Sequence, residues 1–168
     1  MASLSAPTNL KCEYEVNPIG IGSISPRLSW QMDDRRRGAR QTAYQVIAGS
    51  EPGENDLWDT GRVESDASVQ IPYAGSTLRS RQRVYWRVRI WDQDGVETPW
   101  SSVSFFEIGL LDQRDWRGEW ITLPEKEHPV PSPAIYLRNT FELDDQVEDA
   151  RLYITARGVY IPYLNGQR

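Results

Sequence analysis

The sequence predicts an all-β protein built around an antiparallel β-sandwich. No long stretch repeats apolar residues with the period of an α-helix. Short runs of alternating apolar and polar residues recur instead, and clusters of Gly, Pro, Asn and Asp separate them. About seven such strands within about 100 residues is the spacing typical of a sandwich. The expected strands of this region cover residues 10–16, 27–32, 42–48, 57–59, 68–71, 83–91 and 101–108.

The run 83–92 shows the alternation most clearly. One face of a strand here would carry Val84, Trp86, Val88 and Ile90, and the other Tyr85, Arg87, Arg89 and Trp91. Because successive side chains of a strand point to opposite faces, we expect the first set in the core and the second at the surface. The turn residues 92–95 follow, and residues 100–107 are expected to return as the partner strand of a hairpin.

The alternation ends near Gly109, which predicts a boundary. We expect a first domain over 1–109, a linker and proline-rich loop over 110–133, and a second unit over 134–168. The second unit would form strands at 134–143, 150–156 and 159–164 and a type I′ turn at Asn165-Gly166. Because the printed sequence stops two residues after this turn, we expect a truncated β unit that can self-associate through its unpaired sheet edge.

An ordered set of short motifs runs along nearly the whole chain. These are PTNLKCEY at 7–14, NPIGI at 17–21, PRLSW at 26–30, QTAYQV at 41–46, LWDTG at 57–61, YWRVRIWD at 85–92, GLL at 109–111, Trp116 with Trp120-Ile121, ARLYITARG at 150–158, and Asn165-Gly166. Each motif alone is weakly specific, whereas the ordered set is specific. In this order the motifs resemble the N-terminal region of bacterial α-L-rhamnosidases, the enzymes that release terminal rhamnose.

The resemblance implies a fibronectin-III-like or immunoglobulin-like sandwich, followed by the start of a jelly-roll-like, carbohydrate-binding-like β-sandwich. It implies a parent enzyme that hydrolyses terminal α-L-rhamnosides with inversion, using one carboxylic residue as general acid and another to activate water. In such enzymes the catalytic (α/α)₆ barrel lies further along the chain, so no catalytic residue carries over. We therefore expect a structural or accessory role. The alternatives are a free-standing carbohydrate-binding module and a fibronectin-type protein-interaction module.

Neither a catalytic site nor a cofactor or metal site is expected in the chain itself. The acid pairs at 33–34, at 92 and 94, and at 144–145 lie in turn-like contexts, where neighbouring carboxylates cannot flank a sugar ring from opposite faces. His128 is the one histidine and Cys12 the one cysteine, too few for a zinc site.

Two groups of residues are candidate contacts. Arg87, Arg89, Trp91 and Trp100 would form a cation–π ladder on the outer sheet face, an interface with the next domain, or a platform for a sugar. Tyr160, Tyr163 and Asn165 are the plausible sugar contacts of the second unit. The expected partners are downstream domains of the same enzyme, with carbohydrate as a second candidate.

Charge and hydropathy exclude other partners. A net charge of −5 argues against nucleic-acid binding, which needs Lys and Arg against phosphates. No apolar run approaches the roughly 20 residues of a membrane span. The first residues, Met-Ala-Ser-Leu-Ser, do not form a secretory signal, so we expect a cytoplasmic location.

Overall fold

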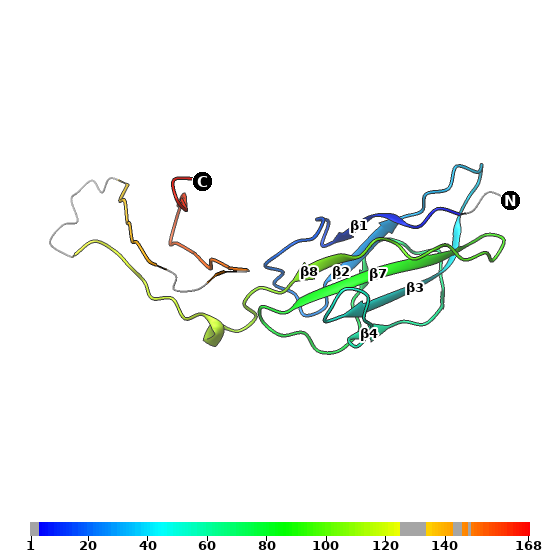
Figure 1. The fold of residues 1–168 in the computed structure, drawn as a ribbon, viewed down its shortest axis with the longest axis horizontal. Helices are drawn as coiled ribbons and strands as arrows, with labels where there is room; N and C mark the ends of the chain where they lie inside the picture. Colours follow the sequence, from blue (N-terminus) through cyan, green and yellow to red (C-terminus); the bar gives the residue numbers. More distant parts are fainter. Residues whose placement is uncertain (1–3, 125–133, 143–145, 148) are drawn as a thin grey trace. The chain divides into compact units, whose positions relative to one another are not determined.

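The computed structural model describes residues 4–124, 134–142, 146–147 and 149–168. The chain divides into two compact units, Met1–Trp116 and Arg117–Arg168, and the strands found in the described residues lie in the first (Figure 1). In the described residues, no helix is long and apolar enough to cross a membrane.

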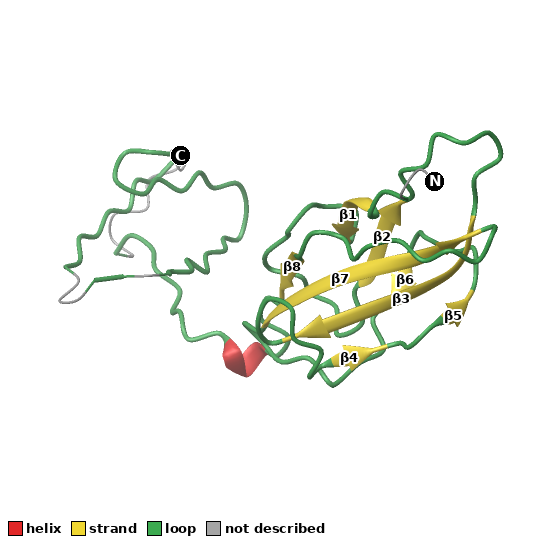
Figure 2. Ribbon diagram, turned by 45° about the vertical axis from the view of Figure 1, so that its right-hand side comes forward, coloured by secondary structure: helices red, strands yellow, loops and turns green. Residues whose placement is uncertain are grey.

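The first unit consists of two antiparallel sheets (Figure 2). The three-stranded sheet has the order β1 (Thr8–Cys12), β2 (Arg27–Gln31), β6 (Ile71–Pro72). The five-stranded sheet has the order β4 (Trp58–Asp59), β3 (Gln41–Gly49), β7 (Arg83–Asp92), β8 (Ser104–Glu107), and β5 (Val63–Glu64) also pairs with β3. This arrangement confirms the predicted antiparallel, immunoglobulin-like sandwich.

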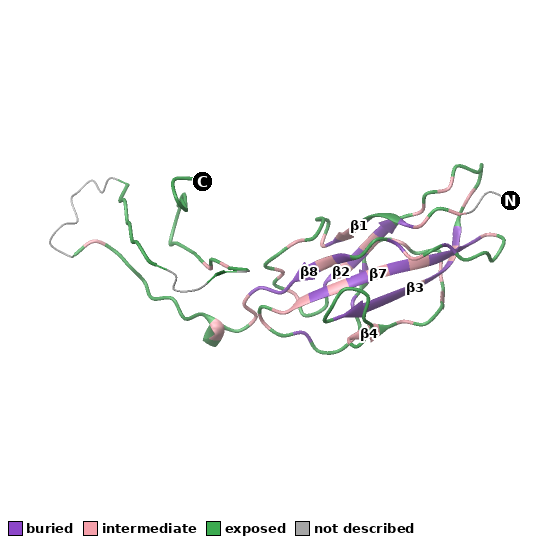
Figure 3. Cartoon of the chain, in the orientation of Figure 1, coloured by how far each residue is buried: buried purple, intermediate pink, exposed green. Residues whose placement is uncertain are grey.

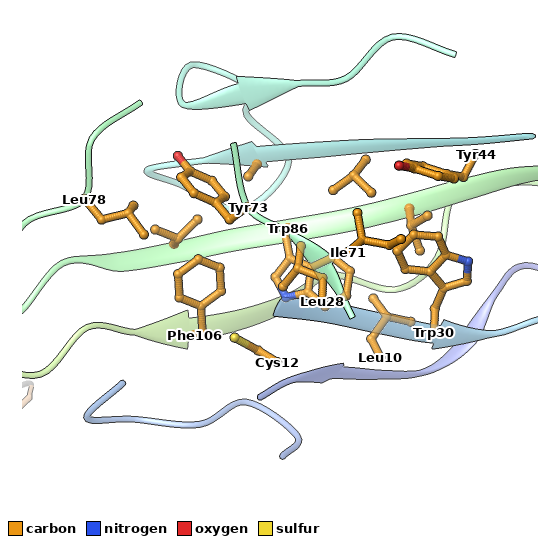
Figure 4. Packing of buried hydrophobic residues seen from close by; sticks show 14 of the residues in the cluster. Leu10, Cys12, Leu28, Trp30, Tyr44, Ile71, Tyr73, Leu78, Trp86 and Phe106 are labelled. Atoms are coloured by element: carbon orange, nitrogen blue, oxygen red, sulfur yellow. The ribbon is translucent and has the colours of Figure 1, made fainter. Parts of the chain in front are cut away.

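The core lies between the two sheets, as the alternation along β7 predicts. Val84, Val88 and Ile90 are fully buried and Trp86 is 1% exposed. Buried and half-buried stretches alternate along β7 (Figure 3). From the opposite sheet, β2 contributes residues such as Leu28, which packs in the same cluster (Figure 4). Because every second residue of the central strands is apolar, the two sheets close on a continuous core.

The strand after the 92–95 turn is shorter than predicted. It covers Ser104–Glu107 instead of 101–108. Before it, the chain stays beside β7 through backbone bonds from Thr98 to Ile90 and from Ser101 to Val88, both 2.9 Å. The Thr98 and Ser101 hydroxyls accept the Ile90 and Val88 N–H groups, each at 3.1 Å. Side-chain hydroxyls thus replace the carbonyls of a regular ladder, which corrects the predicted strand boundary.

Strand β1 also ends earlier than predicted, at Cys12 instead of residue 16. Glu13 and Tyr14 both have positive φ, 47° and 73°, and form a tight turn. Cys12 and Glu15 close this turn with two backbone hydrogen bonds of 2.9 and 3.0 Å. Two successive left-handed residues reverse the direction of the chain, so β1 stops here.

The second unit differs most from the sequence-based prediction. The strands predicted at 134–143, 150–156 and 159–164 do not form in its described residues, none of which is buried. Without buried apolar surface, nothing offsets the conformational entropy lost in ordering strands. The type I′ turn is confirmed: Leu164 and Gln167 exchange hydrogen bonds of 2.8 and 3.0 Å around Asn165 and Gly166, whose φ angles are 51° and 79°.

Candidate functional site

The outer face of β7 gathers arginine and tryptophan side chains into one stack. We call this set, Arg62, Trp91, Arg89, Trp100 and Arg87, the Arg–Trp ladder. The Cζ atom of Arg62 lies 4.8 Å and that of Arg89 5.2 Å from the ring centroid of Trp91. The Cζ atoms of Arg89 and Arg87 lie 4.8 and 4.9 Å from the centroid of Trp100. Arginines and tryptophans therefore alternate through five residues.

The structure brings together the four residues predicted to lie together on the outer sheet face, and it adds a fifth, Arg62. Sequence reasoning missed Arg62 because it lies between β4 and β5, 21 positions before the start of β7 at Arg83. Strands β5 and β7 both pair with β3, which brings Arg62 to the face of Trp91. No local sequence pattern carries that information.

Trp91 is buried, at 7% exposure, although it faces away from the core. The prediction of a surface position is wrong here, because the guanidinium groups of Arg62 and Arg89 cover the indole. Each such contact contributes on the order of 0.5–2 kcal/mol, with the higher values for desolvated pairs. The ladder therefore holds β5, β7 and the segment after the hairpin turn together on the outside of the sheet.

The charges along the ladder are unevenly balanced. Arg62 pairs with Glu64 at 2.7 Å, and Arg89 pairs with Glu97 at 3.3 Å. Arg87 forms no ion pair with any described residue; its Nη2 donates at 3.4 Å to the Gly53 carbonyl. Its buried Nε has no hydrogen-bond partner among the described residues. Arg87 is thus the cation of the ladder that lacks an acidic partner in the described structure.

Three of the acidic residues weighed as candidates converge on one arginine. The guanidinium of Arg36 lies 2.6 Å from Asp34, 2.5 Å from Asp92 and 2.9 Å from Asp94. The Asp92 carboxylate also accepts the N–H groups of Asp94 and Val96, at 3.0 and 2.8 Å. These bonds fix the hairpin turn between β7 and the returning chain.

The pKa values of these carboxyls follow from their partners. Burial raises the pKa of Asp92, but the bonds from Arg36 and from the two backbone N–H groups outweigh it and leave the pKa below its ordinary value. Hydrogen bonds from Arg36 likewise lower the pKa of Asp34. A general acid in a glycosidase needs the opposite shift. Asp144, Asp145 and His128 lie outside the described residues.

The candidate sugar contacts of the second unit are only partly brought together. Tyr163 and Asn165 line a hollow, together with Leu152, Pro162, Leu164, Gln167 and Arg168. Tyr160 does not line it; its hydroxyl donates to the Ile154 carbonyl at 3.2 Å. Within the described ranges, no group of three or more His, Cys, Asp or Glu side chains is placed to hold a metal ion.

A two-sheet antiparallel sandwich with buried tryptophans in its core defines a β-module of the immunoglobulin class. The family model described as "Rha78A-like, N-terminal immunoglobulin domain" matches residues 7–112. The chain belongs to this family.

Longer proteins contain the same region. A protein of Formosa agariphila named alpha-L-rhamnosidase is 41% identical over 162 residues, covering 90% of this chain and 18% of the relative. One from Streptomyces avermitilis with the same name is 37% identical over 182 residues, covering 95% of this chain and 18% of the relative. The chain thus spans about a fifth of the length of the curated relatives that it matches.

A solved structure extends the similarity to three dimensions. The crystal structure of Streptomyces avermitilis alpha-L-rhamnosidase complexed with L-rhamnose matches with a TM-score of 0.69 and 42% sequence identity. The match covers 72% of this chain and 12% of that one. In such relatives this module is one part of a larger multidomain protein.

Proposed function

We propose that this chain acts as a non-catalytic accessory module of an α-L-rhamnosidase, whose other domains hydrolyse terminal α-L-rhamnosides with inversion. One observation carries the proposal. Relatives named alpha-L-rhamnosidase match 90% or more of this chain, yet the chain accounts for 18% of their length. The remaining four-fifths leave ample room for a catalytic domain.

The ion pairs that the acidic residues form support a non-catalytic role. An inverting glycosidase needs two carboxyl groups about 6.5–9.5 Å apart, one of them protonated. Asp34, Asp92 and Asp94 are instead drawn together onto Arg36. Glu107 pairs with Arg83 at 2.8 Å on β8. The bonds from Arg36 keep the pKa values of Asp34 and Asp92 below the ordinary aspartate value, so these two carboxyls are poor proton donors at neutral pH.

The composition of the Arg–Trp ladder favours it as the surface through which the module contacts the rest of the enzyme. Tryptophan and arginine are the residues most enriched at the energetic centres of protein interfaces. Arg87 has a buried Nε without an acceptor among the described residues and no carboxylate partner there. A carboxylate from a downstream domain would balance the charge of this guanidinium. We propose that the Arg87–Trp100 end of the ladder is this contact.

Module exchange tests the proposal. The matching region of the Streptomyces avermitilis enzyme is replaced by this chain, and hydrolysis of an aryl α-L-rhamnoside and thermal unfolding are measured. We expect an active chimera. In it, Arg87→Ala should lower the unfolding temperature more than it does in the free chain, because only the chimera contains the partner carboxylate.

Arg62→Ala is the matched control for the interface. Arg62 lies at the other end of the ladder and already pairs with Glu64. Its loss should therefore lower the unfolding temperature equally in the free chain and in the chimera. A chimera that folds but does not hydrolyse the substrate would contradict the accessory role. Equal effects of Arg87→Ala in both proteins would contradict the interface.

A carbohydrate contact in the second unit is the second candidate function, favoured by the hollow that Tyr163 and Asn165 line.

The second unit also exposes large apolar residues, with Tyr136 at 94% and Val159 at 99% exposure. Exposed apolar surface of this kind favours association. We propose that the free chain self-associates through these apolar residues. Sedimentation at increasing protein concentration would detect this association, and a mass that stays monomeric would contradict it.

A further inference from the structure

The outer face of the β1-β2-β6 sheet places an exposed tyrosine among polar side chains. Along β2, Leu28 and Trp30 are buried, whereas Arg27 and Ser29 are partly exposed on the other face. Tyr14 lies in the turn directly after β1 and is 57% exposed, although it belongs to the well-packed first unit. The core therefore does not explain the position of this ring.

The backbone holds Tyr14 in a conformation that its side chain disfavours. Glu13 and Tyr14 have φ angles of 47° and 73°, in the left-handed region. A turn of this kind forms readily with Asn-Gly, whereas residues with large side chains are strained there. Strained residues of this kind persist only where neighbouring contacts fix them, and they cluster at functional sites.

Besides the backbone bonds between Cys12 and Glu15, one arginine contributes contacts that fix the turn. The Glu13 carboxylate accepts the Arg27 backbone N–H at 2.8 Å and its Nη2 at 2.6 Å. This ion pair lowers the pKa of Glu13 through the hydrogen bonds from Arg27, even though burial opposes the shift. The charge of Arg27 beside Tyr14 is therefore balanced by Glu13.

The polar groups around Tyr14 form a connected chain. The guanidinium of Arg27 lies over the tyrosine ring, 5.5 Å from its centroid. Its Nη1 donates to Gln70 Oε1 at 3.2 Å, and Gln70 Nε2 donates to the Tyr14 hydroxyl. Gln70 also has positive φ, 57°, and its N–H is bonded to Ser29 Oγ at 3.0 Å. Two separate strained positions thus orient the groups around one exposed ring.

We propose that Tyr14, Arg27 and Gln70, which we call the tyrosine platform, bind an uncharged pyranose sugar. An aromatic ring offers an apolar surface for the C–H groups of a sugar, and its polar edge stays hydrated. The guanidinium and amide groups beside it supply donors and an acceptor for sugar hydroxyls. Because Glu13 balances Arg27, the platform favours an uncharged sugar over an acidic one. The site goes beyond the accessory role proposed above and does not depend on it.

Titration of the 168-residue chain, followed by the NMR shifts of its backbone amides, tests the platform. The probes are methyl α-L-rhamnoside and methyl β-D-glucoside as uncharged sugars, and D-glucuronate as an acidic one. We expect saturating shifts at Tyr14, Arg27 and Gln70 with at least one uncharged sugar, with a dissociation constant in the millimolar range, and weaker binding of glucuronate.

Tyr14→Gly removes the ring without endangering the turn, because glycine adopts positive φ readily. This variant should unfold at the same or a higher temperature and bind the sugar at least about tenfold more weakly, a loss of roughly 1.4 kcal/mol. Tyr14→Phe keeps the ring and should retain most of the affinity. Tyr163→Ala, in the second unit, should leave the shifts of the platform unchanged.

Three results would overturn the platform: no saturating shift with either uncharged sugar, unchanged binding in Tyr14→Gly, or binding lost in Tyr163→Ala instead. None of these results bears on the activity of the module-exchange chimera. Failure of the platform and failure of the accessory role are therefore distinguishable.

Discussion

Trp86→Ala should lower the free energy of unfolding by about 3–5 kcal/mol, as expected for truncating a large aromatic residue in a packed core. Trp86 lies in the middle of β7, is 1% exposed, and packs between the two sheets with Leu28 and Phe106 (Figure 4). The cavity left behind cannot be refilled by the rigid strands around it. Urea denaturation followed by circular dichroism measures the loss.

A smaller change at the same position gives a sharper test. The indole Nε1 of Trp86 is buried and has no hydrogen-bond partner among the described residues. The indole Nε1 of Trp30 donates to Gln41 Oε1 at 2.9 Å. Replacing Trp86 by Phe removes a buried, unpaired donor, which offsets about 1–3 kcal/mol of the lost packing. Trp86→Phe should therefore destabilise less than Trp30→Phe, and the reverse order would contradict this.

Asp92→Ala should cost about 2–4 kcal/mol, because it leaves two backbone N–H groups near the hairpin turn without their acceptor. The side chain of Asp92 is 1% exposed and accepts from the N–H groups of Asp94 and Val96 as well as from Arg36. Asp94→Asn is the matched control, since Asp94 contacts the same arginine but is 60% exposed. The control should change the free energy of unfolding little.

The same carboxyl gives the stability a pH dependence of definite sign. The pKa of Asp92 lies below its ordinary value in the folded protein. The ionised Asp92 carboxylate therefore contributes to the free energy of unfolding at pH values above the ordinary aspartate pKa of about 3.9. This contribution is lost as the pH falls through the lower pKa that Asp92 has in the folded protein. The stability difference between the wild type and Asp92→Ala should narrow below about pH 4. A constant difference between about pH 7 and pH 3 would contradict the role given to this ionised carboxylate.

The central strands could be predicted because their sequence carries its own pattern. Along β7 buried and partly exposed positions alternate from residue 83 to residue 90, as the sequence pattern predicts. The Asn165-Gly166 turn was equally local, since its two residues favour the required positive φ. In both places the conformation is decided by residues that are neighbours in the sequence.

Sequence patterns are less informative where residues from distant segments decide whether a side chain is buried or which partner it has. Trp91 is buried by Arg62, which comes from a different strand pair. Asp92 is neutralised by Arg36, 56 positions earlier. The apolar–polar alternation continues through residue 16 and predicts a longer strand, so it gives no sign of the turn that begins at Glu13 and exposes Tyr14. None of these pairings leaves a local signature.

The second unit shows a different limit of sequence patterns. Residues 150–156 alternate apolar and polar side chains as a strand would, yet no strand forms and Leu152 is 67% exposed. An alternating pattern predicts which face of a strand would be buried. An ordered strand also needs a neighbouring strand to pair with and an apolar surface to pack against. Neither is present among the described residues of this unit.

The most direct test of the central claim is the hydrolysis of an aryl α-L-rhamnoside by the purified chain alone. We expect no release of the aryl alcohol above the buffer rate, while the chimera that carries this chain in place of its own module hydrolyses the same substrate. The contradicting result is hydrolysis that co-purifies with the isolated chain through successive columns and is absent from a mock preparation of the same host. Such activity would show that the chain is not a non-catalytic accessory module.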